Sequence, residues 1–383
     1  MAARELLEGA LGLAVVLAVS GGVALLLALT QRWHGRLTLD GLEGVQKAHS
    51  RPTARVGGVA LLAGPVALLG VVYASAHGAG HGAVLLNRLC VAGLPAFAAG
   101  LAEDLTKRVG VLFRLLATMA SGLLACAITG VALTRLDIAG IDPLLHSWWL
   151  ALPLTAFCVG GVANSVNIID GFNGLSGFTA LFAFGGYAVL ASAYGDPTLM
   201  SLALVMGAAV LGFLVINWPG GLLFLGDGGA YFTGFVLAWL AVLLVERHPH
   251  LSAFAVLLVL AHPVTEVLFS IYRRKVRKEH PGMPDRLHFH SLVKRRVVDP
   301  LFPRAGATAR NSITGASVGG ITLVLALAAW CTRSSVAWSA AAFLAYAAIY
   351  ITLYARLVRF GWCSPLAFML RRPPLVAARV GQR

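Results

Sequence analysis

Four carboxylates lie at the ends of long apolar segments, and a fifth lies within such a segment, about two turns before its basic end. They are Glu103, Asp104, Asp170, Asp227 and Glu266. Ionisable groups near membrane depth are costly to place there, which makes them candidates for function. Three of them stand in glycine- or asparagine-rich breaks, where a carboxylate can approach a phosphate or a phosphate-bound cation. The set predicts phosphate chemistry on one membrane face, and the alternative is that each acid only marks a helix end.

The segment around Asp170 combines amides, a carboxylate and glycine. Asn164, Asn167 and Asp170 are spaced i, i+3 and i+6, so a helix would carry all three on one face. Gly171 and Gly174 are then expected to break the helix and to permit close backbone approach. Two amides and a carboxylate beside bare backbone suit a sugar or a diphosphate. A polar helix cap is the alternative.

Asp227 is flanked by three glycines where another apolar segment begins. Mg²⁺ typically takes one or two protein carboxylates and fills its remaining positions with substrate phosphates and water. Asp227 is therefore a candidate metal ligand, and an N-cap role is a compatible alternative.

Glu103 and Asp104 are adjacent at the end of an apolar segment and precede Lys107 and Arg108. Adjacent carboxylates raise each other's pKa, which suits one as a base and the other as a metal or substrate contact. The alternative is a solvated helix end.

The longest polar segment, residues 273–312, contains the run D-R-L-H-F-H at residues 285–290 within a strongly basic stretch. His288 and His290 alternate, so on a β-strand they would share one face and could meet a phosphate or a uracil ring. The basic residues could attract anionic lipid headgroups or a nucleotide. Cytoplasmic loops of membrane proteins are basic in any case, and this alternative suffices for most of them.

The composition requires that these groups be positioned by membrane helices. Of the 383 residues, 58% are hydrophobic and 12% are charged, against about 25% charged in a soluble protein. Mean hydropathy is +0.81. A spanning helix needs about 20 apolar residues, and the candidates are 6–29, 56–76, 88–102, 112–134, 148–165, 174–194, 198–216, 229–246, 251–272, 313–332 and 337–357. The expected fold is an all-α polytopic integral membrane protein with eleven spans. It forms one domain over residues 1–383, with 273–312 as a large cytoplasmic loop.

The distribution of positive charge gives the orientation. If the eleven spans alternate, 25 of the 30 Lys and Arg residues lie on one side and 5 on the other. The positive-inside rule then places the N-terminus outside, the C-terminus in the cytoplasm and the five acids on the cytoplasmic side. A net charge of +14 would suggest nucleic acid as the partner of a soluble protein. Here the basic loops account for it, and no nucleic acid is expected.

Five blocks, taken in order, resemble the motifs of the polyprenyl-phosphate N-acetylhexosamine-1-phosphate transferases. They cover roughly residues 30–300. The first block is Lys47-Ala-His49 with Arg55-Val-Gly57-Gly58 (like K-x-H and P-R-x-G-G), and the second is Gly100-Leu-Ala-Glu103-Asp104 (like G-x-x-D-D). The third is residues 164–175 (like N-x-x-N-x-x-D-G-x-[ND]-G-L), and the fourth is Phe224-Leu-Gly-Asp227-Gly-Gly (like F-x-G-D-x-G-S). The fifth runs from Pro263-Val-Thr-Glu266 through Arg273-Arg274 to residues 285–290 (like P-x-x-D, R-R and D-R-x-H-x-H). One block alone would be weak, whereas five on one membrane face are specific.

The departures from the family pattern are mild. Glu103 and Glu266 replace Asp, Ala54 replaces Pro and Ala230 replaces Ser. No carboxylate is lost, so an active enzyme is expected. The H-x-H run differs from the three consecutive histidines of the MurNAc-pentapeptide branch and favours the GlcNAc-type branch.

The resemblance implies a reaction, its substrates and a location. An N-acetylhexosamine 1-phosphate would pass from a UDP-sugar to undecaprenyl phosphate, with release of UMP, as the initiating step of a cell-surface polysaccharide. The enzyme would depend on Mg²⁺, with Mn²⁺ able to substitute. It would work in the lipid bilayer of the bacterial inner membrane, on the cytoplasmic face. Relatives often form dimers, so a homodimer is a further expectation. A double displacement through an aspartyl nucleotide stays open beside direct transfer.

The resemblance also implies roles for individual residues. Implied catalytic residues are Glu103, Asp104, Asp170 and Asp227, of which Glu103 and Asp104 would lie beside the lipid phosphate. Implied metal ligands are Asp227 and Asn167. Implied substrate-binding residues are Lys47, His49, Arg55, Asn164, Asn167, Asn173, Arg286, His288 and His290.

Two functions from other classes are kept as alternatives. A catalytically altered family member could act as a scaffold, which the Asp-to-Glu change at Glu103 leaves open. A secondary transporter would also have many helices and intramembrane acids, but its site should lie near the bilayer midplane between inverted repeats. The acids here lie at the inner edge, and no repeat stands out.

Overall fold

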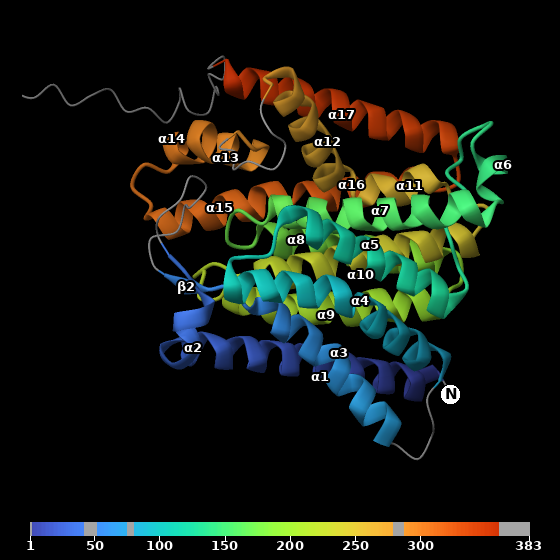
Figure 1. Cartoon of the computed structure of the whole chain (residues 1–383), viewed down its shortest axis with the longest axis horizontal. Helices are drawn as coiled ribbons and strands as arrows, with labels where there is room; N and C mark the ends of the chain where they lie inside the picture. Colours follow the sequence, from blue (N-terminus) through green and yellow to red (C-terminus); the bar gives the residue numbers. More distant parts are fainter. Residues whose placement is uncertain (1, 42–51, 75–79, 279–286, 360–383) are drawn as a thin grey trace, which may run out of the picture.

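The structure is a computed structural model, and it describes residues 2–41, 52–74, 80–278 and 287–359. Long helices lie side by side and run between two ends of the molecule (Figure 1). They are α1 (Ala2–Leu29), α3 (Gly57–Ala74), α4 (His81–Thr106), α5 (Val111–Thr129), α7 (Trp148–Ile169), α8 (Leu175–Ala193), α9 (Pro197–Asn217), α10 (Gly226–Arg247), α11 (Ala253–Val259), α12 (Ala261–Val276), α15 (Ala307–Gly319), α16 (Ile321–Thr332) and α17 (Val336–Val358).

The helices match the predicted spans. Within the described residues, ten helices are long and apolar enough to cross a membrane, with α15 and α16 forming one of them. The pair α11 and α12 makes an eleventh if it is counted as one span. Each predicted segment falls on one of these helices, so the all-α polytopic fold is confirmed. The orientation of the termini stays a prediction.

The ninth span is bent by 81° between α11 and α12. Pro263 explains the break, because proline has no N–H to donate to the carbonyl four residues earlier and its ring clashes with that carbonyl. The carbonyl in question belongs to Val259, the last residue of α11. Leu260 lies between the two helices. The bend turns α12, with its basic last turn, away from the direction of α11.

Short elements fill the connections. They are α2 (Gln31–Thr38), β1 (Leu39–Asp40), β2 (Thr53–Ala54), α6 (Asp142–Leu145), α13 (Phe289–Val293), the π-helical turn η1 (Lys294–Val298) and α14 (Asp299–Leu301). β1 and β2 pair antiparallel, with Leu39 opposite Ala54. The predicted loop 273–312 is therefore not continuous loop, because α12 enters it, α13, η1 and α14 lie within it and α15 begins at Ala307.

α10 is the central helix of the bundle. In its most apolar stretch 94% of the residues are buried, against 11% in α17 and 17% in α1. It packs against α4, α7, α3 and α8. A helix that is hydrophobic on all sides is expected either in a core or against lipid. α10 takes the core position, while α1 and α17 present their apolar sides to the outside of the bundle.

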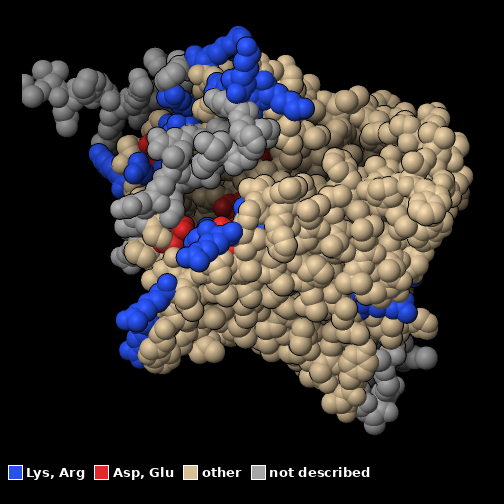
Figure 2. All heavy atoms as spheres, in the orientation of Figure 1, with Lys and Arg blue, Asp and Glu red and all other residues tan. Residues whose placement is uncertain are grey.

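Charged groups gather toward one end of the molecule. Figure 2 shows acidic and basic side chains together around a hollow on the left, while the broad middle carries almost none. Asp227 lies in the first turn of α10 and Glu246 in its last turn. At 1.5 Å per residue this helix is about 33 Å long, so its two acids lie at opposite ends of the bundle.

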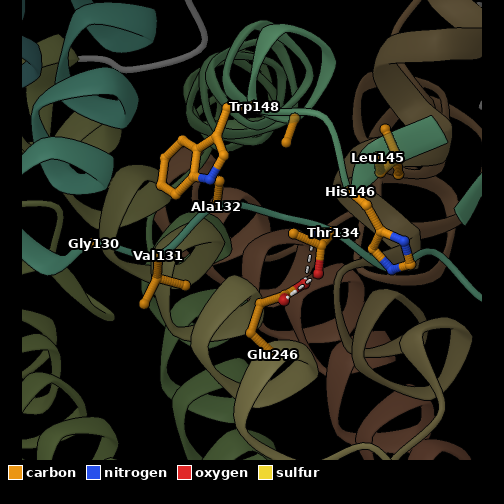
Figure 3. A pocket seen from close by; sticks show the side chains of 9 residues that line it. Gly130, Val131, Ala132, Thr134, Leu145, His146, Trp148 and Glu246 are labelled. Atoms are coloured by element: carbon orange, nitrogen blue, oxygen red, sulfur yellow. Dashed lines mark hydrogen bonds between the residues drawn. The ribbon is translucent and has the colours of Figure 1, made fainter. Parts of the chain in front are cut away.

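A pocket of about 210 Å³ lies at the Glu246 end (Figure 3). Its lining includes Thr134, His146, Trp148 and Glu246. The Glu246 carboxylate accepts hydrogen bonds from the amide and the hydroxyl of Thr134, at 2.7 and 2.6 Å. These bonds tie the segment after α5 to the end of α10, so Glu246 serves the fold.

Candidate active site

The first and fourth motifs are joined through their backbones. The amide of Phe224 donates to the carbonyl of Ala54 at 2.8 Å. The amides of Gly57 and Gly58 donate to the carbonyls of Phe224 and Leu225, each at 2.9 Å. Residues before α3 and residues before α10 therefore form one rigid unit, although they are far apart in the sequence.

Glycine is required where this unit meets α4. A Cβ on Gly100 would lie 2.5 Å from the carbonyl carbon of Asp227 and from the amide nitrogen of Gly228. A Cβ on Gly58 would lie 2.3 Å from the amide nitrogen of Gly229. These neighbours are backbone atoms, which cannot move aside as a flexible side chain can. Glycines of the first, second and fourth motifs thus allow three helices to meet at Asp227.

Asp104 organises the start of α10. One of its carboxylate oxygens accepts the amide of Asp227 and the other accepts the amide of Gly228, each at 2.9 Å. It is 1% exposed, so it is not the solvated helix end that the alternative supposed. A negative side chain near the first N–H groups of a helix satisfies donors that otherwise lack a partner.

Asp227 binds two arginines. Nη2 of Arg55 donates to Oδ1 of Asp227 at 2.8 Å, and Nη1 of Arg114 donates to Oδ2. Arg55 also lies 3.7 Å from Asp104 and 3.8 Å from Asp40. We name Asp40, Arg55, Asp104, Arg114 and Asp227 the carboxylate–arginine cluster. Asp227 is not the N-cap of α10, because it lies inside the first turn and the cap residue is Leu225.

The acids of the cluster keep Arg55 charged. Burial by itself would lower the pKa of Arg55, but Asp227, Asp104 and Asp40 together raise it above its usual value. Arginine binds carboxylate and phosphate through the same planar fork of N–H donors. A phosphate group that enters the cluster can therefore replace a carboxylate as the partner of Arg55 or Arg114.

Glu103 does not join its neighbour in the cluster. Its carboxylate accepts the amide of Val109 at 2.7 Å and so closes the turn after α4. Adjacent residues on an α-helix point about 100° apart, because a turn has 3.6 residues. One member of the predicted pair therefore faces Asp227, while the other caps the connection to α5. This placement gives the longer arm of Glu103 a local backbone partner.

Asp170 lies just beyond the end of α7. The helix ends at Ile169, so Asn164 and Asn167 are helical and Asp170 is not, which corrects the predicted shared helix face. Gly174 has a φ of +82° and precedes α8, as expected for a glycine that breaks the helix. The loop is anchored by Asn217, whose Oδ1 accepts the amide of Gly174 at 2.6 Å and whose Nδ2 donates to Leu223.

Asn173 is a buried residue of the same loop. Its Nδ2 donates to the hydroxyl of Ser312 at 3.3 Å. A Cβ on Gly221 would lie 2.7 Å from Nδ2 of Asn173, so the backbone before α10 passes close to it. Asn173 therefore helps to pack this loop, whereas Asn164 and Asn167 are half-buried on the last turns of α7.

Desolvation raises the pKa of Asp170 to about 6, and the charge of Arg55 opposes this while that of Asp227 adds to it. A carboxyl with a raised pKa binds its proton more tightly in the folded state than in the unfolded state. Wild-type stability therefore falls as the pH rises from about 4 to 6, and the loss persists above pH 6.

Asp170→Asn is accordingly expected to raise the free energy of unfolding at pH 7.5 by about 1–2 kcal/mol. This value is smaller than the whole pKa shift would give, because Asp170 is partly exposed to solvent. The gain should shrink at pH 4.5. Thermal unfolding in detergent at both pH values measures it. Asp299→Asn removes an acid that pairs with Lys294 and controls for net charge. A loss of stability at pH 7.5 would show that the desolvation of Asp170 is not the dominant effect.

His288 and His290 lie at the start of a helix. His288 is the residue before α13 and His290 lies within it, so the predicted strand is wrong. A strand needs a hydrogen-bonded neighbour, and the described residues form one sheet, β1 with β2. The two rings stack nevertheless, with centroids 5.4 Å apart and planes 11° apart. A Cβ on Gly171 would lie 2.7 Å from Nε2 of His290, so the histidines lie beside the Asp170 loop.

Three predicted residues and one predicted site remain to be placed. Lys47, His49 and Arg286 lie outside the described residues. Within the described ranges, no three His, Cys, Asp or Glu side chains are grouped so that they could hold a metal by themselves. The motifs missed Arg114 and Asn217, since neither belongs to a block. The signal for Arg114 was only a basic residue near the cytoplasmic end of a predicted span.

This geometry defines a class of protein, a polytopic helical membrane protein with a carboxylate–arginine cluster at one end of the helix bundle. The family model described as glycosyl transferase family 4 matches residues 86–245. This match bears out the family resemblance that the five motifs predicted.

The chain is also similar in sequence to named bacterial proteins. The probable undecaprenyl-phosphate N-acetylglucosaminyl 1-phosphate transferase of Bacillus subtilis (strain 168) is 27% identical over 251 residues, which cover 64% of this chain and 66% of that protein. The undecaprenyl-phosphate alpha-N-acetylglucosaminyl 1-phosphate transferase of Escherichia coli (strain K12) is 26% identical over 280 residues, 70% of each chain. The protein of that name from Yersinia pestis is 27% identical over 201 residues, or 49% of this chain and 52% of that protein. The aligned part thus covers just under two thirds of the Bacillus protein.

Proposed function

We propose that the protein transfers an N-acetylhexosamine 1-phosphate from a UDP-sugar to undecaprenyl phosphate and releases UMP. The observation that carries this proposal is the contact of Asp227 with Arg55, Arg114 and the α10 start held by Asp104. Arginines poised on a carboxylate suit substrates that bring phosphate groups. The names of the relatives supply the sugar and lipid classes. We further propose that this transfer initiates a cell-surface polysaccharide.

The carboxylate oxygens of the cluster fit Mg²⁺ if substrate phosphates and water supply the other ligands. The cluster offers hard carboxylate oxygens, but no described group of three ligands that would enclose an ion. Mg²⁺ is usually held by one or two carboxylates, together with substrate phosphates and water. The Asp227 carboxylate of the cluster and the side chain of Asn167, in the last turn of α7, would hold the ion together with the diphosphate, and Mn²⁺ is expected to substitute. When bound, it would neutralise charge that develops on the phosphate oxygens.

The residues of the chain would bind, orient and neutralise. A phosphate oxygen of the lipid would attack the β-phosphorus of the UDP-sugar, and the bond from that phosphorus to the UMP oxygen would break. Transfer of this kind depends on positioning and on electrostatic stabilisation more than on covalent chemistry. Arg55 and Arg114 would bind the phosphate groups in place of Asp227. Asp170, His288 and His290 would border the donor, and Asp104 would keep the start of α10 in place.

The site would face the cytoplasm at the inner membrane of a bacterium. The cluster lies at the end of the bundle where basic residues gather (Figure 2). Basic residues favour the cytoplasmic side of a membrane protein. UDP-sugars would then reach the polar end of the bundle from water, while the lipid phosphate would arrive from the bilayer.

An assay with purified protein tests the proposal. We expect UMP release that requires undecaprenyl phosphate, Mg²⁺ and one of a panel of UDP-N-acetylhexosamines, and that stops completely when EDTA removes the ion. The panel should contain UDP-GlcNAc and a UDP-linked 6-deoxy-N-acetylhexosamine. The preferred donor identifies the sugar.

Three other outcomes contradict parts of the proposal. UMP release without the lipid would indicate hydrolysis of the donor. Release that survives EDTA would refute the metal role. If folded protein releases no UMP with any donor of the panel, transfer from these donors is refuted, which leaves an unusual donor or a scaffold role.

A further inference from the structure

Glu266, in the fifth motif, has no direct part in the transfer described above. It is fully buried on α12, and several groups that can donate a hydrogen bond lie against its carboxylate. The Tyr350 hydroxyl lies at 2.7 Å, Nδ1 of His288 at 2.9 Å and the amide of Phe289 at 3.2 Å. An ionised carboxylate only accepts, so this set of donors matches a charged Glu266. A buried charge without such partners would be strongly destabilising.

Glu266 fixes the state of His288. Because the carboxylate accepts from Nδ1, that nitrogen carries the hydrogen, and Nε2 is left to act elsewhere. A carboxylate behind a histidine sets both its tautomer and the orientation of its ring. His288 is 5% exposed, so its ring has little freedom beyond these contacts.

The effect extends to the Asp170 loop through a second histidine. His288 stacks on His290. The His290 ring in turn lies against Gly171, the neighbour of Asp170. Glu266 is thus linked through two stacked rings to the loop proposed to border the UDP-sugar.

Tyr350 completes this arrangement from the last helix. It belongs to α17 and is 2% exposed. It lies outside the five motifs and outside the residues that the family model matches. Its ring also packs on Phe289, with centroids 5.0 Å apart. One side chain of α17 therefore contacts both the carboxylate and the residue between the two histidines.

We propose that Tyr350, acting with Glu266, is a positioning residue that holds His288 and His290 against the donor-binding loop. The inference rests on the proposed function, and α17 would then be part of the active-site structure. Loss of the Tyr350 hydroxyl should leave the carboxylate with fewer donors and the His288 ring less restrained. We expect the transfer step, measured as kcat, to be affected most, because it would require the histidines in a single orientation.

Tyr350→Phe and Tyr346→Phe form a matched pair. Tyr346 lies one turn earlier on α17, and its hydroxyl lies 2.7 Å from Nδ1 of His262, whereas the hydroxyl of Tyr350 donates to Glu266. We expect Tyr350→Phe to lower kcat about tenfold with the KM for the UDP-sugar little changed, as for other residues that orient an active-site histidine. Tyr346→Phe should lose similar thermal stability but keep its kcat. Equal losses of kcat in the two variants would overturn the proposal.

A double-mutant cycle tests whether Tyr350 acts through His288. In a His288→Ala background, Tyr350→Phe should cause no further fall in kcat, because the shared partner is gone. A full additional loss would refute the positioning role. Should Tyr350→Phe fail to fold, Glu266→Gln takes its place in the same cycle.

A chemical measurement separates this proposal from the proposed function. Modification of His288 by diethyl pyrocarbonate, followed by peptide mass spectrometry, needs no substrate. We expect faster modification in Tyr350→Phe than in wild type or Tyr346→Phe. If wild type shows no transfer but this difference is found, the proposed function fails and the positioning role stands. If wild type transfers and neither kcat nor modification responds, only the positioning role fails.

Discussion

Asp227→Asn is expected to lower sugar-phosphate transfer at least about a thousandfold, the upper range seen when one preorganised electrostatic group is removed. The substitution removes the charge that binds Arg55 and Arg114, and the proposed oxygen ligand of Mg²⁺ is weakened. Both effects act where the diphosphate is proposed to lie. The initial rate of UMP release, measured at saturating UDP-sugar and undecaprenyl phosphate, tests the expectation.

Asp196→Asn is the matched control. Asp196 is also a buried acid next to a guanidinium, with Nη1 of Arg247 at 3.1 Å. It caps α9 by accepting the amide of Leu199 at 2.9 Å, and it lies far from the cluster. We expect some loss of stability there, by about 1 kcal/mol for a lost cap, and little loss of transfer. If Asp227→Asn retains wild-type transfer, the role of Asp227 is wrong; if both variants lose transfer equally, the loss reflects folding.

Gly100→Ala is expected to destabilise the protein by about 3 kcal/mol or more, because the new methyl group would overlap backbone. Its nearest neighbours would be the carbonyl carbon of Asp227 and the amide of Gly228, each at 2.5 Å. α4 and α10 would have to separate at the point where Asp104 holds Asp227. A misplacement of about 1 Å at a reacting group can cost about a hundredfold in rate. Half-life at elevated temperature in detergent measures the first effect, and the transfer rate of surviving protein measures the second.

Gly161→Ala provides the comparison. Gly161 also lies within a spanning helix, α7, but a Cβ there would meet nothing within 4 Å. We expect a neutral or slightly stabilising effect, up to about 1 kcal/mol, because alanine restricts the unfolded chain. Similar half-lives for the two variants would refute the close packing of α4 on α10.

The spans were predictable because the bilayer imposes a length and a composition on each helix. The bent ninth span begins within its predicted segment, 251–272, and runs past it to Val276. The bend angle was not predictable, since it depends on how α12 packs against α7 and α17. The short helices within residues 289–301 were not predicted, for a related reason. Such short elements are stabilised by tertiary contacts and carry little periodic signal.

The candidate site was partly predictable because its glycines and acids serve geometry as well as chemistry. Asp104 and Asp227 were predicted on the same membrane face, and they meet because Gly58, Gly100 and the glycines of α10 permit close approach. Glu103 and Asp104 have different partners because the rotation of α4 about its axis turns Asp104, and not Glu103, toward Asp227. Two adjacent acids in a sequence do not reveal this rotation. Arg114 and Tyr350 were missed because motifs record local spacing, whereas Arg114 and Asp227 are 113 positions apart in the chain and Tyr350 and Glu266 are 84 apart.

The central position of α10 has a consequence for the order in which the protein is made. Arg55 and Asp227 are 172 positions apart in the chain, and Asp104 and Asp227 are 123 apart. At a synthesis rate of about 5–20 residues per second, roughly 10–35 s pass between the emergence of Arg55 and that of Asp227. The helices from α3 to α9 are synthesised during this interval, before Asp227 is available to Arg55 and Arg114. The most buried helix therefore arrives late, and its insertion beside Gly58 and Gly100 brings together groups synthesised long before it.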